Sequence, residues 1–168
     1  MSRPQGKEAP RLEVRFAGPG DEATVARLLL EAFEPYRERY TPGGFADTTA
    51  SEDVVRERFD TGRVWLAFDG DEAVGTVTAF PDDRGYGVYI RSMAVTPKAQ
   101  GAGVGQKLLD ALEQDARDRG ETHLRLYTTY VLPAAQPLYE KNGFVVIRDT
   151  APEEWHDMGG VEMEKILN

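Results

Sequence analysis

Residues 91–109 read RSMAVTPKAQGAGVGQKLL, and this stretch decides the fold. An apolar strand end leads into a turn with glycines at positions 101, 103 and 105, and an amphipathic helix follows at once. Backbone N–H groups of such a turn converge on one point, with the positive end of the helix dipole behind them. Glycine allows positive φ values and lets a ligand approach without a Cβ in the way. The stretch therefore predicts an anion site that suits a phosphate group.

Length and charge limit what the chain can be. Its 168 residues are enough for one domain with a sizeable core and are short for two. We expect a flexible tail over residues 1–11 and a single domain over residues 12–168. The net charge of −9 argues against a nucleic-acid partner, because phosphate backbones demand a basic surface. An acidic surface suits a cationic substrate such as an amine, although it also serves simply to keep a protein in solution.

The residue types that are missing exclude several kinds of site. The chain has no cysteine, which removes disulfides, thiolate nucleophiles and cysteine metal sites. His123 and His156 are its only histidines, so we expect no metal site. Residues 1–11 lack the apolar core of a signal peptide, and no run approaches the roughly 20 apolar residues of a membrane span. We therefore expect a cytoplasmic protein with no membrane partner.

Apolar periodicity predicts the remaining elements. Strands are expected at residues 12–16, 64–68, 73–80, 86–95, 123–128, 144–148 and 161–167. Helices are expected after an N-cap at Asp21, after a capping box at Thr49–Glu52, and over about residues 103–119 and 133–142. Residues 34–50 look irregular. The order β-α-α-β-β-β-α-β-α-β-β predicts an α+β domain with a mixed sheet.

Three interpretations of the glycine turn compete before any resemblance is considered. A Walker motif ends in Gly-Lys-Ser/Thr, whereas residues 105–108 read GQKL and offer no hydroxyl to magnesium. A dinucleotide fingerprint needs G-x-G-x-x-G and a later strand-end acid, whereas the turn has G-x-G-x-G and residues 123–128 hold no acid. A turn without a ligand stays open, but glycines at a helix start, each costing up to ~1 kcal/mol, would then have little purpose.

Two segments together resemble one known family. QGAGVG at residues 100–105 resembles the Q/R-x-x-G-x-G/A signature of the GCN5-related N-acetyltransferase (GNAT) superfamily, and SMAVTP at residues 92–97 is similar to its fourth strand. AQPLYEKNGF at residues 135–144 is similar to the family's A-x-x-L-Y-E-K-x-G-F segment, in the family's order and at ordinary separation. The resemblance implies a mixed, mostly antiparallel central sheet of about seven strands flanked by about four helices.

The resemblance also implies acetyl-CoA as the co-substrate. Its pyrophosphate would lie on the amides of the turn, where Lys98 and Lys107 could add charge. The fourth strand would bulge and part from the fifth, so that main-chain groups of Met93 and Val95 pair with the pantetheine arm. The implied cofactor-binding residues are Met93, Ala94, Val95, Gln100, Gly101, Ala102, Gly103, Val104, Gly105 and Gln106.

The implied reaction is direct transfer of an acetyl group to a primary amine of a small molecule or peptide. Tyr139 matches the tyrosine that the family commonly uses to protonate the leaving thiolate, and a purely structural phenol is the alternative. The amine must lose a proton before attack, because a lysine-like amine has a pKa of ~10.4. The base is open among Glu31, Glu34, Glu154 and a chain of waters.

The chain departs from the family pattern at two positions. Leu132 stands where an asparagine is often found, so its contact to the cofactor arm is lost or comes from Thr128 or Thr129. Residues 89–92 read YIRS, without the glutamate that often serves as general base. The alternative to an enzyme is therefore a catalytically idle acyl-CoA-binding or sensing module on the same fold. A nucleotide-binding switch is the third hypothesis.

Recognition of the acceptor is expected at residues 34–50, at the turn around Asp82 and at the loop over residues 153–158. The aromatic side chains that would form a wall or a lid, unless they serve as core anchors, are Tyr36, Tyr40, Phe45, Trp155 and His156. Arg91 could pair with a carboxylate on the acceptor, which would indicate an amino acid or a peptide. The resemblance leaves a homodimer open, because family members often dimerise.

Overall fold

The computed structural model describes residues 11–168, so the expected tail lies, apart from Arg11, outside the described residues. Its seven strands form one sheet in the order β1-β2-β3-β4-β5-β7-β6. The strands are β1 (Leu12–Phe16), β2 (Arg63–Asp69), β3 (Glu72–Pro81), β4 (Val88–Val95), β5 (His123–Thr129), β6 (Val145–Thr150) and β7 (Gly160–Ile166). Within this sheet β4 and β5 are the parallel pair and the other pairs are antiparallel. The predicted mixed, mostly antiparallel sheet is confirmed.

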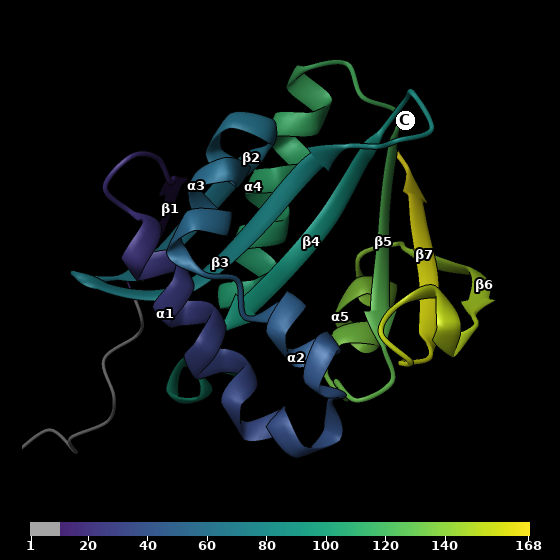
Figure 1. The fold of residues 1–168 in the computed structure, drawn as a ribbon. Coiled ribbons are helices and arrows are strands. Elements are labelled where there is room, and N and C mark those ends of the chain that lie inside the picture. The colour runs from purple at the N-terminus through teal and green to yellow at the C-terminus, as the bar shows by residue number, and fades with distance from the viewer. Residues whose placement is uncertain (1–10) are drawn as a thin grey trace, which may run out of the picture.

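Five α-helices in the described part of the chain cover the two faces of this sheet (Figure 1). They are α1 (Glu22–Phe33), α2 (Pro42–Thr48), α3 (Glu52–Thr61), α4 (Val104–Asp118) and α5 (Ala135–Lys141). On one face α4 packs against β1 to β4 and buries Leu108 and Leu112. On the other face α1 and α3 bury Leu28 and Val55. The sheet is therefore apolar on both sides, as a two-core α+β fold requires.

The sequence does not predict α2, which lies within the segment expected to be irregular. Pro42, Gly43 and Gly44 open this helix, and two glycines weaken a helix start. Tertiary contacts hold it in place: the Thr41 hydroxyl donates to the carbonyl of His156 at 2.7 Å and also accepts from the Gly44 amide. The helix forms because the loop after β6 supports it.

The predicted start of α3 is wrong by two residues. Ser51 is the N-cap, and its Oγ accepts from the Val54 amide at 3.3 Å. Thr49 instead ends α2, and its hydroxyl donates to the carbonyl of Phe45 at 2.8 Å. Asp21 does occupy the N-cap position of α1, but its carboxylate accepts from Gly18 and Arg15 rather than from a helical amide.

Ser51→Ala is expected to lower the free energy of unfolding by about 1 kcal/mol, because an alanine leaves the Val54 amide without its cap. Chemical denaturation of the variant and the parent measures the change. Thr49→Ala is the matched control and is expected to cost less, since its hydroxyl makes only a back-bond within α2. If Thr49→Ala lowered the free energy of unfolding more than Ser51→Ala, the result would favour the capping box that the sequence predicts at Thr49.

Candidate active site

A cavity of about 700 Å³ opens where β4 and β5 separate. The two strands pair only from Val88 to Ile90, and the last pair is Ile90 with Leu126. Beyond it the cavity is lined by the end of β4, the glycine turn, the start of α5 and residues from α1 and the β6–β7 loop. The sheet is therefore split at its centre, and the split gives access to both of its faces.

A bulge in β4 causes this separation. Thr78 of β3 pairs with Arg91 and Thr76 pairs with Ala94, so β4 contains one residue more than β3 between these pairs. Within this bulge Ser92 has φ 58°, the left-handed region that a serine rarely occupies. The expected bulge of this strand away from β5 is confirmed.

The bulge leaves main-chain groups of β4 facing the gap. The Thr96 amide donates to the carbonyl of Val74 at 2.9 Å and thus points toward β3. Because successive residues of a regular strand direct their amides and carbonyls to opposite edges, Val95 points the other way, where β5 has diverged. Met93 belongs to the bulge and lines the cavity. The Gln100 side chain donates to the Val95 carbonyl at 3.4 Å. The main chain at Met93 and Val95 therefore lines the gap that β5 leaves, and the Val95 carbonyl accepts only the long bond from Gln100 there.

The glycine turn has the geometry of an anion site. Gly101 and Gly103 have φ values of +82° and +85°, and a Cβ at either would meet no atom within 4 Å. Gly103 is the N-cap of α4 and has no side chain to satisfy the helix amides. Within residues 11–168 the amides of Gly101, Gly103, Val104 and Gly105 have no hydrogen-bond acceptor. Four donors thus meet the positive end of a 15-residue helix.

Nearly all of the residues that the sequence predicts for the co-substrate line this one cavity: Met93, Ala94, Val95, Gln100, Gly101, Gly103, Val104, Gly105 and Gln106. Ala102 is exposed outside the lining, and its amide donates to the carbonyl of Ala99. Lys98 forms an ion pair with Glu72, and Lys107 is exposed and does not line the cavity. Lys141, which lies within the AQPLYEKNGF segment, does line the cavity, although the sequence analysis assigns it no role.

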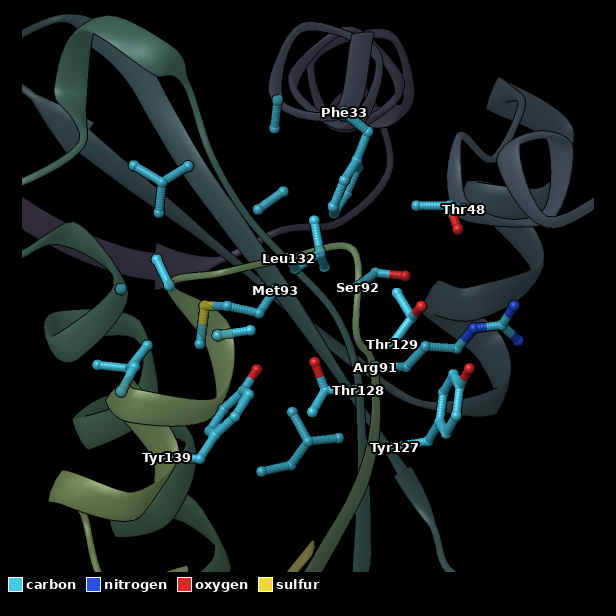
Figure 2. A pocket seen from close by; sticks show the side chains of 18 of the residues that line it. Phe33, Thr48, Arg91, Ser92, Met93, Tyr127, Thr128, Thr129, Leu132 and Tyr139 are labelled. Carbon is cyan, nitrogen blue, oxygen red and sulfur yellow. The ribbon is translucent and has the colours of Figure 1, made fainter. Parts of the chain in front are cut away.

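Tyr139 of α5 is buried and lines the cavity. Figure 2 shows its hydroxyl and that of Thr128 directed into the same space beside Met93. The ring packs edge-on against Phe144 with centroids 5.5 Å apart. Burial raises the pKa of Tyr139 well above its ordinary value, so the phenol keeps its proton at neutral pH. Among the described residues its hydroxyl has no hydrogen-bond partner.

Thr128 and Thr129 were suggested to replace the contact that is lost because Leu132 stands in place of an asparagine. Their hydroxyl groups have different surroundings. Thr129 Oγ1 donates to the carbonyl of Gly159 at 3.2 Å and is engaged in the fold. Thr128 is buried, lines the cavity and has no recorded side-chain partner within residues 11–168. Leu132 also lines the cavity. Of the two threonines, Thr128 is the one whose hydroxyl is available.

None of the suggested bases is a free carboxylate in the cavity. Glu31 and Glu34 are paired with arginines on their own helices and do not line it. Glu154 lines it, but both of its oxygens are held by Arg148 at 2.6 and 3.0 Å. Hydrogen bonds from Arg148 and the Ala151 amide lower the pKa of Glu154 to about 2. Such a weakly basic carboxylate is a poor proton acceptor.

Glu162 of β7 also lines the cavity, and the sequence analysis missed it. Its oxygens accept from Arg125 at 2.9 Å and from Arg148 at 2.9 Å, so it is held as firmly as Glu154. No local pattern in β7 could have indicated this position. It follows only from the pairing of Glu162 with Tyr127 on β5.

The expected acceptor segments are brought together only in part. Tyr36, Tyr40 and Trp155 line the cavity, whereas Phe45 is buried in the core against Tyr40 and His156 lies outside the lining. The turn around Asp82 is not part of the lining. Asp82 is instead buried in an ion pair with Arg125 at 2.8 Å. That turn joins the ends of β3 and β4 that lie away from the bulge, so its expected role is wrong.

Comparison with known proteins identifies the family. Residues 25–144 match the sequence profile of the Acetyltransferase (GNAT) family, which covers more than half of the chain. The chain belongs to the GNAT acetyltransferase family. This membership makes it an enzyme of the N-acetyltransferase class and confirms the expected family and fold. No helix within residues 11–168 is both long and apolar enough to cross a membrane.

Several relatives of this GNAT protein have names. It is 28% identical over 139 residues to the uncharacterised N-acetyltransferase YhfO of Bacillus subtilis, covering 79% of this chain and 89% of the relative. It is 32% identical over 138 residues to a mycothiol acetyltransferase of Rhodococcus erythropolis, covering 77% of this chain. That alignment spans 44% of the relative, so the chain matches less than half of the mycothiol enzyme's length.

Solved structures show the same fold. The PaiA N-acetyltransferase of Thermoplasma acidophilum, in complex with coenzyme A, superposes with a TM-score of 0.78 at 19% identity, covering 93% of this chain and 99% of that one. A GNAT acetyltransferase of Elizabethkingia anophelis with acetyl-CoA bound gives a TM-score of 0.69 at 20% identity, covering 93% and 98%.

Proposed function

We propose that the protein transfers an acetyl group directly from acetyl-CoA to a primary amine of a small molecule or peptide. One observation carries the proposal: a single cavity contains the unpaired amides of the glycine turn, the stretch of β4 at Met93 and Val95 from which β5 has diverged, and the hydroxyl of Tyr139. These are a phosphate site, a pairing edge for an extended arm and a proton donor. Acetyl-CoA needs the first two, and departure of its thiolate needs the third.

The residues fit each part of this co-substrate. The pyrophosphate would be bound by the amides of residues 101–105, with Lys141 nearby to add positive charge. The pantetheine arm would pair with Met93 and Val95, and the Thr128 hydroxyl would contact it in place of the side chain lost at Leu132. The thioester would then lie beside Tyr139.

Transfer requires attack by a neutral amine on the thioester carbonyl and cleavage of the C–S bond, with Tyr139 giving its proton to the leaving thiolate. Burial keeps that phenol protonated, which suits a general acid. The carboxylates that line the cavity, Glu154 and Glu162, are both held by arginines. We therefore propose that water, rather than a carboxylate, accepts the proton of the incoming amine.

This assignment predicts how the rate depends on pH. The neutral fraction of the amine grows as pH rises toward its own pKa, while Tyr139 keeps its proton because its pKa is raised. We expect kcat/KM to rise with pH, to show no fall below about pH 9.5 and to shift with the pKa of the acceptor chosen. Profiles measured with two amines of different pKa check this. A rising limb at the same pH for both amines would indicate an enzyme base.

Thiol release from acetyl-CoA, measured over a panel of amines, tests the proposed function directly. Release that depends on both substrates, with the acetylated amine found by mass spectrometry, is the expected result. If the protein binds acetyl-CoA in a calorimeter but no amine releases thiol, the idle acyl-CoA-binding module is the better description.

A further inference from the structure

Arg91 faces the half of the cavity that lies opposite the glycine turn. It is the residue of β4 just before the bulge, and Figure 2 shows its side chain between Thr48 and Tyr127. The guanidinium meets Asp47 of α2, with Nη2 at 2.7 Å from Oδ2, and 36% of the side chain is exposed. Arg91 thus lies two residues along the strand from Met93, with which the pantetheine arm is proposed to pair.

Asp47 satisfies Arg91 incompletely. The same oxygen, Oδ2, also accepts from the Trp155 indole at 2.9 Å and lies 3.4 Å from Nε2 of His156. Within residues 11–168 the Nε and Nη1 groups of Arg91 have no acceptor. Arg91 therefore keeps two donors that can serve a ligand in the cavity.

A second guanidinium lies behind the bulge and has no carboxylate of its own. Arg58 of α3 is only 5% exposed, and its Nη1 donates to Ser92 Oγ at 3.0 Å. Within residues 11–168 it forms no ion pair, although buried charges are normally paired. Burial and the neighbouring Arg91 lower the pKa of Arg58 to about 10, and Asp47 offsets this only in part. Asp47 is thus ion-paired with Arg91, while Arg58 adds a positive charge behind the bulge that no carboxylate among residues 11–168 pairs with directly.

We infer that the acceptor carries a carboxylate close to its amine, as a free amino acid does, and that Arg91 binds this carboxylate within the positive potential of Arg58. The inference rests on the proposed function and names its substrate class. With Nη2 on Asp47, Nε or Nη1 can each still donate a charge-assisted hydrogen bond to a carboxylate. The tyrosines of the same wall, Tyr36, Tyr40 and Tyr127, supply an aromatic surface for the rest of a small molecule.

Matched acceptors test the inference. A panel of L-amino acids is assayed for thiol release, each beside its carboxamide and its decarboxylated amine. The carboxamide has the lower amine pKa and the larger neutral fraction, so intrinsic reactivity alone would favour it. We expect the opposite order for the best side chain, with kcat/KM at least about tenfold higher for the acid, the gain that one charged hydrogen bond provides.

Substitutions at Arg91 separate recognition from general damage. Arg91→Gln is expected to abolish the preference of kcat/KM for the acid over its carboxamide and to leave KM for acetyl-CoA unchanged. Arg91→Lys keeps a positive charge and is expected to retain part of the preference. Arg56→Gln is the matched control: Arg56 is an exposed arginine of α3 that pairs with Asp53 outside the cavity, and its loss should change neither acceptor.

Calorimetry with free coenzyme A present gives a second readout that does not need turnover. If amines are acetylated but acid, amide and decarboxylated amine are used alike, or Arg91→Gln weakens all three equally, the inference is overturned and the proposed function stands. If no amine releases thiol yet amino acids bind and Arg91→Gln removes that binding, the carboxylate site stands and the proposed function fails. Equal binding of acid and amide overturns the site.

Discussion

Tyr139→Phe is expected to lower kcat by about 10²- to 10⁴-fold, the range over which a positioned general acid acts. The variant removes one oxygen and keeps the ring, so its packing against Phe144 is retained. The hydroxyl has no other partner among the described residues, so its loss leaves no buried group unsatisfied. Steady-state kinetics measures kcat, and calorimetry should find the affinity for coenzyme A within about twofold of the parent.

Tyr86→Phe serves as the matched control. Tyr86 is 49% exposed, packs its ring against His123 and lies outside the cavity lining, so removal of its hydroxyl should leave kcat unchanged. Equal activity of parent and Tyr139→Phe would reject the acid role and leave Tyr139 as a structural phenol. A fall in stability rather than in kcat would point the same way.

Gly103→Val is expected to weaken binding of coenzyme A at least about 100-fold, because two charge-assisted hydrogen bonds of about 1.5–3 kcal/mol each would be lost. Gly103 has φ +85°, which a β-branched residue cannot adopt without strain. Relief of that strain rotates the peptide groups, and the amides of Gly103 and Val104 then no longer converge. Isothermal titration with coenzyme A measures the change in affinity.

The same helix offers a control for strain alone. Gly120 follows the end of α4, has φ +77° and, like Gly103, has no atom within 4 Å of an added Cβ. Gly120→Val should therefore destabilise the fold by an amount similar to Gly103→Val while leaving the affinity for coenzyme A intact. If the two variants weaken binding equally, the loss reflects unfolding and not the geometry of the turn.

The half of the cavity proposed for acetyl-CoA was predictable from the sequence because its signals are local. Adjacent residues specify the glycine turn, the helix after it and the tyrosine of α5, and the expected elements appear where the pattern places them. The bulge was expected from family resemblance, and its register confirms it. What local patterns could not supply is the conformation of Ser92 and the contact that Arg58 makes to it across 34 residues of sequence.

The acceptor half was poorly predicted because long-range contacts assemble it. The support of α2 comes from a hydrogen bond between Thr41 and His156, 115 residues apart. Phe45 looks like a wall residue in the sequence, but the packing of α2 turns it into the core. Glu162 enters the cavity through strand pairing. The positions of α2, Phe45 and Glu162 each depend on contacts between segments far apart in the sequence, and hydrophobic periodicity carries no information about such contacts.

The short parallel contact between β4 and β5 has a mechanical consequence. Three residue pairs, from Val88–Leu124 to Ile90–Leu126, join the two strands. The sheet therefore consists of two smaller sheets, β1 to β4 and β5 to β7, which are hydrogen-bonded to each other only over this short stretch. A ligand arm paired with Met93 and Val95 would extend the hydrogen-bonded contact between the two halves of the sheet into the gap. The donor would then lie between β4 and β5 as a temporary eighth strand within the sheet, and each turnover would form and release its pairing with β4.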